Sequence, residues 1–221
     1  MKPHVLVIGA SGHAKVVIDI IEKEGKYSIA GLIDHALPKG QIFFNYEVIG
    51  KDEDLDVLIQ GDAIKGCIVA IGDNFIREKV VKKLINIKKD ITFISAIHPS
   101  AQIGRNVKIG VGSVIMAGAI INSDSSIGDF TIINTKVSID HDNIIGDFSS
   151  IAPGATLGGN VRVGNWSTVS LGVNVIHGIK IGNCSLVGAG SLVLKNVNDN
   201  CVSFGHPSIE KRSFNSGDKY L

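Results

Sequence analysis

A histidine followed by a carboxylate is the pair in this chain best suited to proton transfer. His141 and Asp142 lie in the stretch SIDHDN. An imidazole titrates near pH 6.5, so it can accept a proton at neutral pH, and a neighbouring carboxylate can orient it. Ser123 and Gly159, eighteen residues away on either side, are both small and would leave room for a substrate. We therefore expect His141 to be a general base, the alternative being a solvated surface histidine.

The spacing of His141 and His177 raises a metal hypothesis. Gamma-class carbonic anhydrases bind their metal with three histidines, of which two are thirty-six residues apart and the third lies five residues beyond. His141 and His177 match the pair, but the third position is Gly182. Two ligands do not make a catalytic zinc site, so we expect no metal. No nucleophile elbow, zinc-protease motif or P-loop is present either.

A glycine-bearing turn near the start of the chain could bind a phosphate. Gly9 and Gly12 follow an apolar stretch and precede a helical pattern, although Ser11 stands where a full dinucleotide fingerprint has its second glycine. Asp34 ends the next apolar stretch, where such folds contact a ribose or base. A phosphate would lie at the N-terminus of the helix that starts near Gly12. We expect a nucleotide moiety here; a purely structural turn is the alternative.

Two cations, Arg162 and Lys180, are eighteen residues apart and could meet the phosphates of an anionic cofactor or be solvated charges. The chain as a whole has a formal net charge of +1. This balance gives no general attraction to nucleic acid or to an anionic membrane, so we expect neither as a partner.

The element that positions His141 is a six-residue repeat. Neither a helix nor a simple strand has this period; it is typical of a β-helix in which three hexapeptides close a coil of eighteen residues. We expect an aliphatic ladder to point inward, and glycine or polar residues to take turns that need positive φ. The ladder has seventeen positions: Ile97, Ile103, Ile109, Ile115, Ile121, Ile127, Ile133, Ile139, Ile145, Ile151, Leu157, Val163, Val169, Val175, Ile181, Val187 and Val193.

The element that positions the glycine turn is of another kind. Apolar strands are expected at 4–9, 28–34, 66–72 and 92–96, with helices at 14–24 and 74–83. This alternation predicts a small Rossmann-like α/β domain with a parallel sheet. The domains are expected at 1–95 (α/β) and 96–204 (left-handed parallel β-helix), followed by a loose polar tail at 205–221.

Three scattered cysteines argue against a disulfide framework, and no signal peptide or membrane-length apolar run is visible. We therefore expect a cytoplasmic protein.

The chain resembles the bacterial hexapeptide-repeat sugar O- and N-acetyltransferases, a family that includes sialic acid O-acetyltransferases. Within this family it is most similar to the perosamine-type and bacillosamine-type 4-amino-sugar N-acetyltransferases. The similarity lies in VIGASGHAKVVID, AIGDNFIREK, AIHPSA, APGATLGG and, above all, MAGAIINSDSSIGDFTIINTKVSIDHDNIIGDF. It implies a homotrimer with active sites between subunits. The implied activity is acetyl-CoA-dependent N-acetylation of a nucleotide-linked amino sugar for a surface glycan such as O-antigen or capsule, by direct attack without a covalent enzyme intermediate.

The resemblance also implies roles for residues. His141 would be the base, Asp142 would orient it and Asn134 would help to place the reacting groups. The nucleotide-sugar would meet Ser11, Gly12, His13, Asp34, His35 and Gly72. Coenzyme A would meet Ser150, Gly159, Leu171, Lys180, Gly188 and Ala189. Two positions depart from the family pattern, since Ser150 replaces a histidine of several relatives and GHPSI at 205–209 replaces G-x-P-A-K.

Three other functions are weighed against this one. An O-acetyltransferase acting on a sialic acid or related hydroxyl could use the same histidine. A non-catalytic β-helix scaffold would need no outward His-Asp pair flanked by small residues. A sugar nucleotidyltransferase would need a larger first domain. The sequence leaves UDP, GDP and dTDP open as the nucleotide.

Overall fold

A computed structural model describes residues 2–60, 63–215 and 218. The chain divides into two compact units, Met1–Pro99 and Ser100–Leu221. The division falls four residues after the predicted end of the first domain at residue 95.

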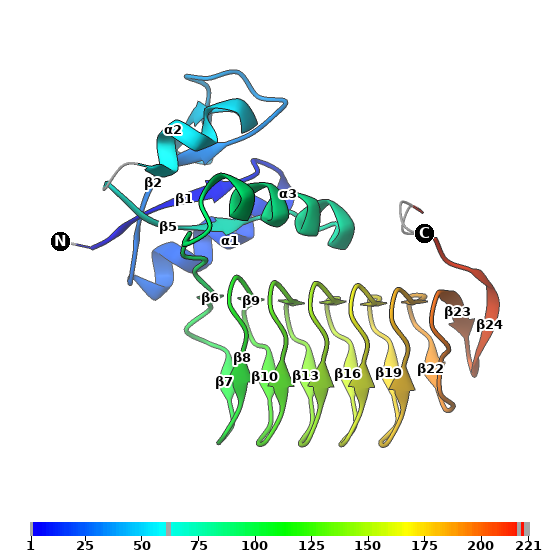
Figure 1. Cartoon of the computed structure of the whole chain (residues 1–221). Coiled ribbons are helices and arrows are strands. Elements are labelled where there is room, and N and C mark those ends of the chain that lie inside the picture. The colour runs from blue at the N-terminus through cyan, green and yellow to red at the C-terminus, as the bar shows by residue number, and fades with distance from the viewer. Residues whose placement is uncertain (1, 61–62, 216–217, 219–221) are drawn as a thin grey trace. The chain divides into compact units, whose positions relative to one another are not determined.

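The first unit has a five-stranded sheet in the order β3-β4-β2-β1-β5 (Figure 1). Neighbouring strands in β4-β2-β1-β5 pair in parallel, while β3 is antiparallel to β4. The predicted parallel-sheet domain is therefore confirmed. The strands are β1 (His4–Ile8), β2 (Ser28–Ile33), β3 (Ile42–Phe43), β4 (Tyr46–Gly50), β5 (Ile64–Val69) and β6 (Ala96–Ile97), and the helices are α1 (Gly12–Glu24), η1 (Asp52–Asp54), α2 (Leu55–Gln60) and α3 (Asn74–Ile87).

Local chemistry explains the main boundaries in this unit. Residues 5–8 of β1 are at most 2% exposed, as expected of a central parallel strand covered on both faces. Helix α1 ends at Gly25, which has the left-handed conformation (φ 70°) typical of a helix end. Helix α3 begins after Asp73, whose carboxylate accepts the N–H groups of Phe75 and Ile76. The segment 40–60, which carries β3, β4 and α2, was not predicted.

The second unit is the predicted β-helix of hexapeptide repeats, and strands eighteen residues apart pair in parallel (Figure 1). Its three faces are as follows. The first holds β7 (Gln102–Ile103), β10 (Ile120–Ile121), β13 (Ser138–Ile139), β16 (Thr156–Leu157), β19 (Asn174–Val175) and β22 (Leu192–Val193). The second holds β8 (Lys108–Ile109), β11 (Ser126–Ile127), β14 (Ile144–Ile145), β17 (Arg162–Val163) and β20 (Lys180–Ile181). The third includes β9 (Val114–Ile115), β12 (Ile132–Ile133), β15 (Ser150–Ile151), β18 (Thr168–Val169), β21 (Leu186–Val187), β23 (Cys201–Gly205) and β24 (Ser208–Ser213).

The aliphatic ladder forms the core of the β-helix. Every ladder position from Ile115 to Val193 is buried, with exposures of 0–4%. At the open end of the solenoid Ile103 is 40% exposed, because no earlier coil of the β-helix covers it. The predicted inward register is therefore confirmed for all coils after the first.

The turns contain the expected glycine and polar residues with positive φ. Positive φ occurs three residues after every ladder position from Ile103 to Val187, for example at Asp142 (φ 58°) and Gly178 (φ 71°), and not at the glycine that directly follows the ladder. Those glycines serve another purpose. A Cβ at Gly146 would lie 2.7 Å from the backbone nitrogen of Asn165 in the next coil, so the close approach of the coils excludes a side chain.

The C-terminal segment is more ordered than predicted. Residues Ser208–Ser213 form β24, which pairs antiparallel with β23, so the expected loose tail is wrong for this stretch. His206 and Pro207 of the GHPSI sequence form the turn between these strands. No helix in the described part of the chain is both long and apolar enough to span a bilayer.

Candidate functional site

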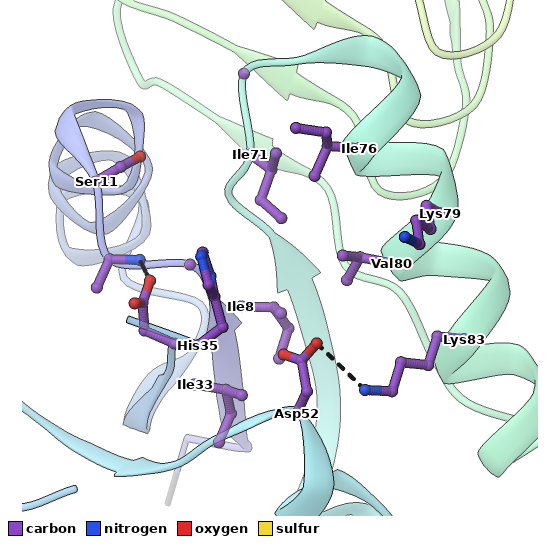
Figure 2. Close-up of a pocket in the computed structure, with 14 residues that line it drawn as sticks. Ile8, Ser11, Ile33, His35, Asp52, Ile71, Ile76, Lys79, Val80 and Lys83 are labelled. Carbon is purple, nitrogen blue, oxygen red and sulfur yellow. Dashed lines mark hydrogen bonds and ion pairs between the residues drawn. The ribbon is translucent and has the colours of Figure 1, made fainter. Parts of the chain in front are cut away.

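The first unit contains a cavity of about 550 Å³ at the carboxyl ends of β1, β2 and β5 (Figure 2). This is the edge at which open α/β sheets bind ligands, and the volume suits a small-molecule ligand. Its apolar walls include Ile8, Ile33, Ile71, Ile76 and Val80, and its polar lining groups include Ser11, Asp34, His35, Asp52, Lys79 and Lys83. Four of the six residues predicted for the nucleotide-sugar line it, namely Ser11, Asp34, His35 and Gly72.

Asp34 organises two loops of this cavity. Its Oδ2 accepts the N–H of Ala10 at 2.8 Å, and its Oδ1 accepts the N–H groups of Ala36 and Leu37 at 2.9 and 3.0 Å. Burial works against the charge of this carboxylate, but the three hydrogen bonds outweigh it and lower the pKa of Asp34. Both carboxylate oxygens thus accept hydrogen bonds from the backbone, so Asp34 fixes the glycine turn and the 34–37 loop.

His13 lies in the first turn of α1 and is not among the residues that line the cavity. Burial, together with the charge of Arg77, lowers the pKa of His13 to about 4, so the ring is neutral. Its buried Nε2 has no hydrogen-bond partner among the described residues. Arg77 itself is 1% exposed and donates to the carbonyls of Ile71 and Gly72, which fixes the turn after β5.

Three charged residues of the cavity were not predicted from the sequence. Asp52 comes from η1, and Lys79 and Lys83 lie one turn apart on α3. Lys83 Nζ lies 3.2 Å from Asp52 Oδ2 (Figure 2). The i, i+4 spacing of two lysines on one helix face, in a domain expected to bind a nucleotide, was a usable signal, whereas Asp52 lies in the segment whose fold was not predicted.

The second unit presents His141 on the turn between β13 and β14. The side chain of His141 is 61% exposed, and its Nδ1 lies 2.7 Å from Asp142 Oδ2. The hydrogen bond to Asp142, followed by the charge of Asp140, raises the pKa of His141 above its usual value. With Nδ1 engaged by the carboxylate, Nε2 is the nitrogen available for a reacting group.

Asn143 holds this turn in shape and was not singled out from the sequence. It is fully buried, and its Nδ2 donates to the carbonyls of Asp140, His141 and Gly158 at 2.7, 3.2 and 3.0 Å. Its Oδ1 is buried without a hydrogen-bond partner in the described part of the chain. The corresponding position one coil earlier is Ser125. In the other repeats, the residue four positions after the ladder residue is small or β-branched. An asparagine at this position was therefore the signal available in the sequence.

Gly159 lies one coil beyond His141, where the sequence predicted open space. A Cβ at this position would lie 2.7 Å from His141 Cε1 and 2.8 Å from His141 Nε2. The imidazole therefore packs over the bare Cα of Gly159. His177, one coil further on the same line of turns, is exposed.

The other residues predicted for the reaction lie on two corners of the prism. We call the turns between the β13 and β14 faces the His141 corner; it carries His141, Asp142, Gly159 and His177. The turns between the β12 and β13 faces are the Asn134 corner; it carries Asn134, Leu171, Gly188 and Ala189. Asn134 Oδ1 accepts the N–H of Thr135 at 2.9 Å, so it is partly committed within its own turn.

Three predicted cofactor residues lie on the faces of the prism. Arg162 and Lys180 are partners in the pairing of β17 with β20, as their spacing predicted. Ser150 lies on β15, on a different face from these two cations. No group of three histidine, cysteine, aspartate or glutamate side chains suited to a metal ion occurs among residues 2–60, 63–215 and 218.

Family models match both units. The PglD N-terminal domain matches residues 4–84, and the bacterial transferase hexapeptide model, of six repeats, matches residues 100–135. Among curated proteins, the UDP-N-acetylbacillosamine N-acetyltransferase of Bacillus subtilis is 34% identical over 117 residues. That match covers 52% of this chain and 51% of the relative, and a match to an uncharacterized mimivirus protein covers 22% of that protein. The chain thus spans about half the length of the first relative and about a fifth of the second.

Solved structures match almost the whole chain. A perosamine N-acetyltransferase from Caulobacter crescentus, in complex with CoA and GDP-perosamine, is 36% identical with a TM-score of 0.89, and the match covers 95% of this chain and 97% of that one. It is a variant in which one histidine is replaced by asparagine. The acetyltransferase domain of PglB from Neisseria gonorrhoeae, in complex with acetyl coenzyme A, is 30% identical with a TM-score of 0.87, covering 96% and 100%.

Proposed function

The chain belongs to the family of bacterial sugar N-acetyltransferases that these structures represent, and from this premise we propose its reaction. It transfers the acetyl group of acetyl-CoA to the 4-amino group of a nucleotide-linked amino-deoxy sugar. The relatives with bound CoA, acetyl-CoA and GDP-perosamine support both substrates. The cavity of the first unit binds the nucleotide, and the β-helix carries the catalytic base.

The chemistry follows from the free nitrogen of His141. The neutral amine attacks the thioester carbonyl, so a carbon–nitrogen bond forms. Nε2 of His141 takes the proton that the nitrogen must lose as the tetrahedral intermediate forms. The carbon–sulfur bond then breaks, and the thiolate of CoA leaves and is protonated. General base catalysis of this kind contributes roughly 10²–10⁴-fold to the rate. Asp142 orients the ring and stabilises the imidazolium.

The observation that carries this proposal is the His141–Asp142 pair over Gly159. The ring is exposed, held at Nδ1 by a carboxylate at 2.7 Å, and bordered by a residue without a side chain. A surface histidine without a function would need neither the carboxylate nor the space. A non-catalytic scaffold is disfavoured for the same reason.

We further propose that the active site is shared between copies of the chain in a homotrimer. Within one chain, a whole face of the prism separates the His141 corner from the Asn134 corner. A neighbouring copy that brings its Asn134 corner to the His141 corner would place Asn134, Leu171, Gly188 and Ala189 beside the base. Sedimentation or light scattering of the purified chain would test the trimer, and a monomer that retains full activity would contradict it.

The proposed setting is surface-glycan assembly in the cytoplasm, where acetyl-CoA and nucleotide-sugars are available. The purified chain would be incubated with acetyl-CoA and nucleotide-linked 4-amino sugars, and free thiol and product mass would be measured. We expect thiol release only with the amine and a product that resists mild base, because an amide does and an ester does not. Release with a hydroxyl acceptor such as a sialic acid, giving a base-labile product, would favour the O-acetyltransferase alternative.

A further inference from the structure

We propose that Asp52 and Lys83 recognise the Watson–Crick edge of guanine, so that the nucleotide held in the cavity is a guanosine diphosphate. This inference rests on the proposed function, since it names the nucleotide of the substrate. It concerns two residues that no sequence motif pointed to.

The two side chains come from different elements and face each other across one end of the cavity. Asp52 stands on η1 and Lys83 on α3, and Figure 2 shows their charged atoms pointing toward each other near Ile8, Ile33 and Val80. The Lys83 side chain is 43% exposed and that of Asp52 is 41% exposed, with 3.2 Å between the charged atoms. An exposed ion pair of this kind contributes little to stability, about 0–1 kcal/mol, so it is available to exchange its partners.

The surrounding walls suit a flat base. The aliphatic side chains of Ile8, Ile33 and Val80 offer apolar surface against which the ring can pack. The opposite end of the cavity suits phosphates, because Ser11 precedes α1 and no acidic residue lies in the first turn of that helix. Figure 2 shows Ser11 and the Asp52–Lys83 pair at opposite sides of the cavity. A nucleotide with its phosphates at α1 therefore directs its base toward Asp52 and Lys83.

The donors and acceptors of the pair select guanine. Lysine offers only donors, and an ionised aspartate offers two acceptor oxygens. The guanine edge presents the O6 acceptor beside two donors, N1–H and N2–H, so Lys83 can donate to O6 while Asp52 accepts from both nitrogens. Uracil and thymine have a single donor between two carbonyl oxygens, and one of those oxygens would face the second carboxylate oxygen. Adenine offers one donor and one acceptor on this edge, so it would leave one carboxylate oxygen unused.

The test is the affinity of the full-length chain for GDP, UDP, dTDP and ADP, measured by calorimetry without acetyl-CoA. We expect GDP to bind about tenfold or more tightly than the others, because a site whose polar groups match one hydrogen-bonding edge discriminates against ligands that lack the matching groups. Asp52→Asn and Lys83→Met should each weaken GDP about tenfold and bring the GDP to UDP ratio near one. Lys82→Met is the matched control, since Lys82 lies on the same helix but pairs with Glu78 and does not line the cavity.

Two results would overturn the inference. One is tighter binding of UDP or dTDP than of GDP, and the other is an unchanged GDP to UDP ratio in Asp52→Asn. Thermal unfolding of each variant without nucleotide would show that the fold is kept. If GDP binds as expected but no amino sugar is acetylated, the proposed function fails while this inference stands. If only UDP-linked or dTDP-linked amino sugars are acetylated, the proposed function stands while this inference fails.

Discussion

The imidazole of His141 packs over the Cα of Gly159, the residue eighteen positions further on, where a Cβ would lie 2.7 Å from the ring. Two residues on successive coils thus set the position of the proposed base. The strand pairing of β13 with β16 fixes the register between them. A β-helix keeps such a relationship rigid because each coil is hydrogen-bonded to the next.

Gly159→Ala should reduce kcat about tenfold or more. The added methyl group would push the imidazole aside, and misplacement of a reacting group by about 1 Å can cost 10²-fold. The fold should tolerate the change, because the group displaced is an exposed side chain and φ at Gly159 is not positive. Steady-state kinetics and thermal unfolding would check this, with Ser123→Ala as the control one coil earlier. An unchanged kcat would show that the ring does not act from this position.

His141→Ala should lower kcat by about two orders of magnitude or more while leaving the affinity for CoA nearly intact. The side chain is exposed, so its loss removes the base and little packing. His177→Ala, which changes another exposed histidine two coils away, should be much milder. If the His177 variant were the more damaged of the two, the base would be misassigned.

Asp142→Asn should move the acid limb of the kcat–pH profile to lower pH and reduce kcat. The base acts only when neutral, so activity is lost as the pH falls through the pKa of His141. The hydrogen bond to Asp142 raises that pKa, and an amide would remove most of the effect. Asparagine tolerates the positive φ of this position.

The matched control for Asp142→Asn is Asp124→Asn. Asp124 occupies the same turn position one coil earlier, also with positive φ, but follows Ser123 and not a histidine. Its profile should match that of the wild type. An acid limb that stays in place in Asp142→Asn would mean that another group sets it.

Asn143→Leu should lower both stability and kcat. A leucine of similar shape would leave the carbonyls of Asp140, His141 and Gly158 without the amide that now binds them, at a cost of about 1–3 kcal/mol for a buried group left unpaired. Denaturant unfolding and kinetics would measure the two effects. Asn143→Ser, which copies Ser125 of the preceding coil, should lose less of each. Full activity in Asn143→Leu would show that the turn keeps its shape without the amide.

The sequence by itself determined the β-helix, its register and the placement of His141 beside Gly159. A strict six-residue period of aliphatic residues predicts a β-helix with coils of eighteen residues. Residues eighteen positions apart are then neighbours on successive coils. The strand–helix alternation of the first unit was clear for β1, α1, β2, β5 and α3, because VLVI of β1 is apolar enough to be covered on both faces. The segment 40–60 was not predicted, and the strand expected at 92–96 is reduced to an isolated bridge between Cys67 and Phe93.

Tertiary structure decided what local patterns do not encode. The glycines after the ladder are required by the backbone of the next coil and not by φ, a distinction that only packed coils reveal. The Asp34 carboxylate accepts hydrogen bonds from three backbone N–H groups, because the loops that it joins meet only in the folded sheet. Asp52 and Lys83, thirty-one residues apart, become partners because η1 and α3 border the same cavity. Long-range side-chain pairing of this kind leaves no periodic trace in the chain, and it is to this pair that we assign the proposed specificity for a nucleotide.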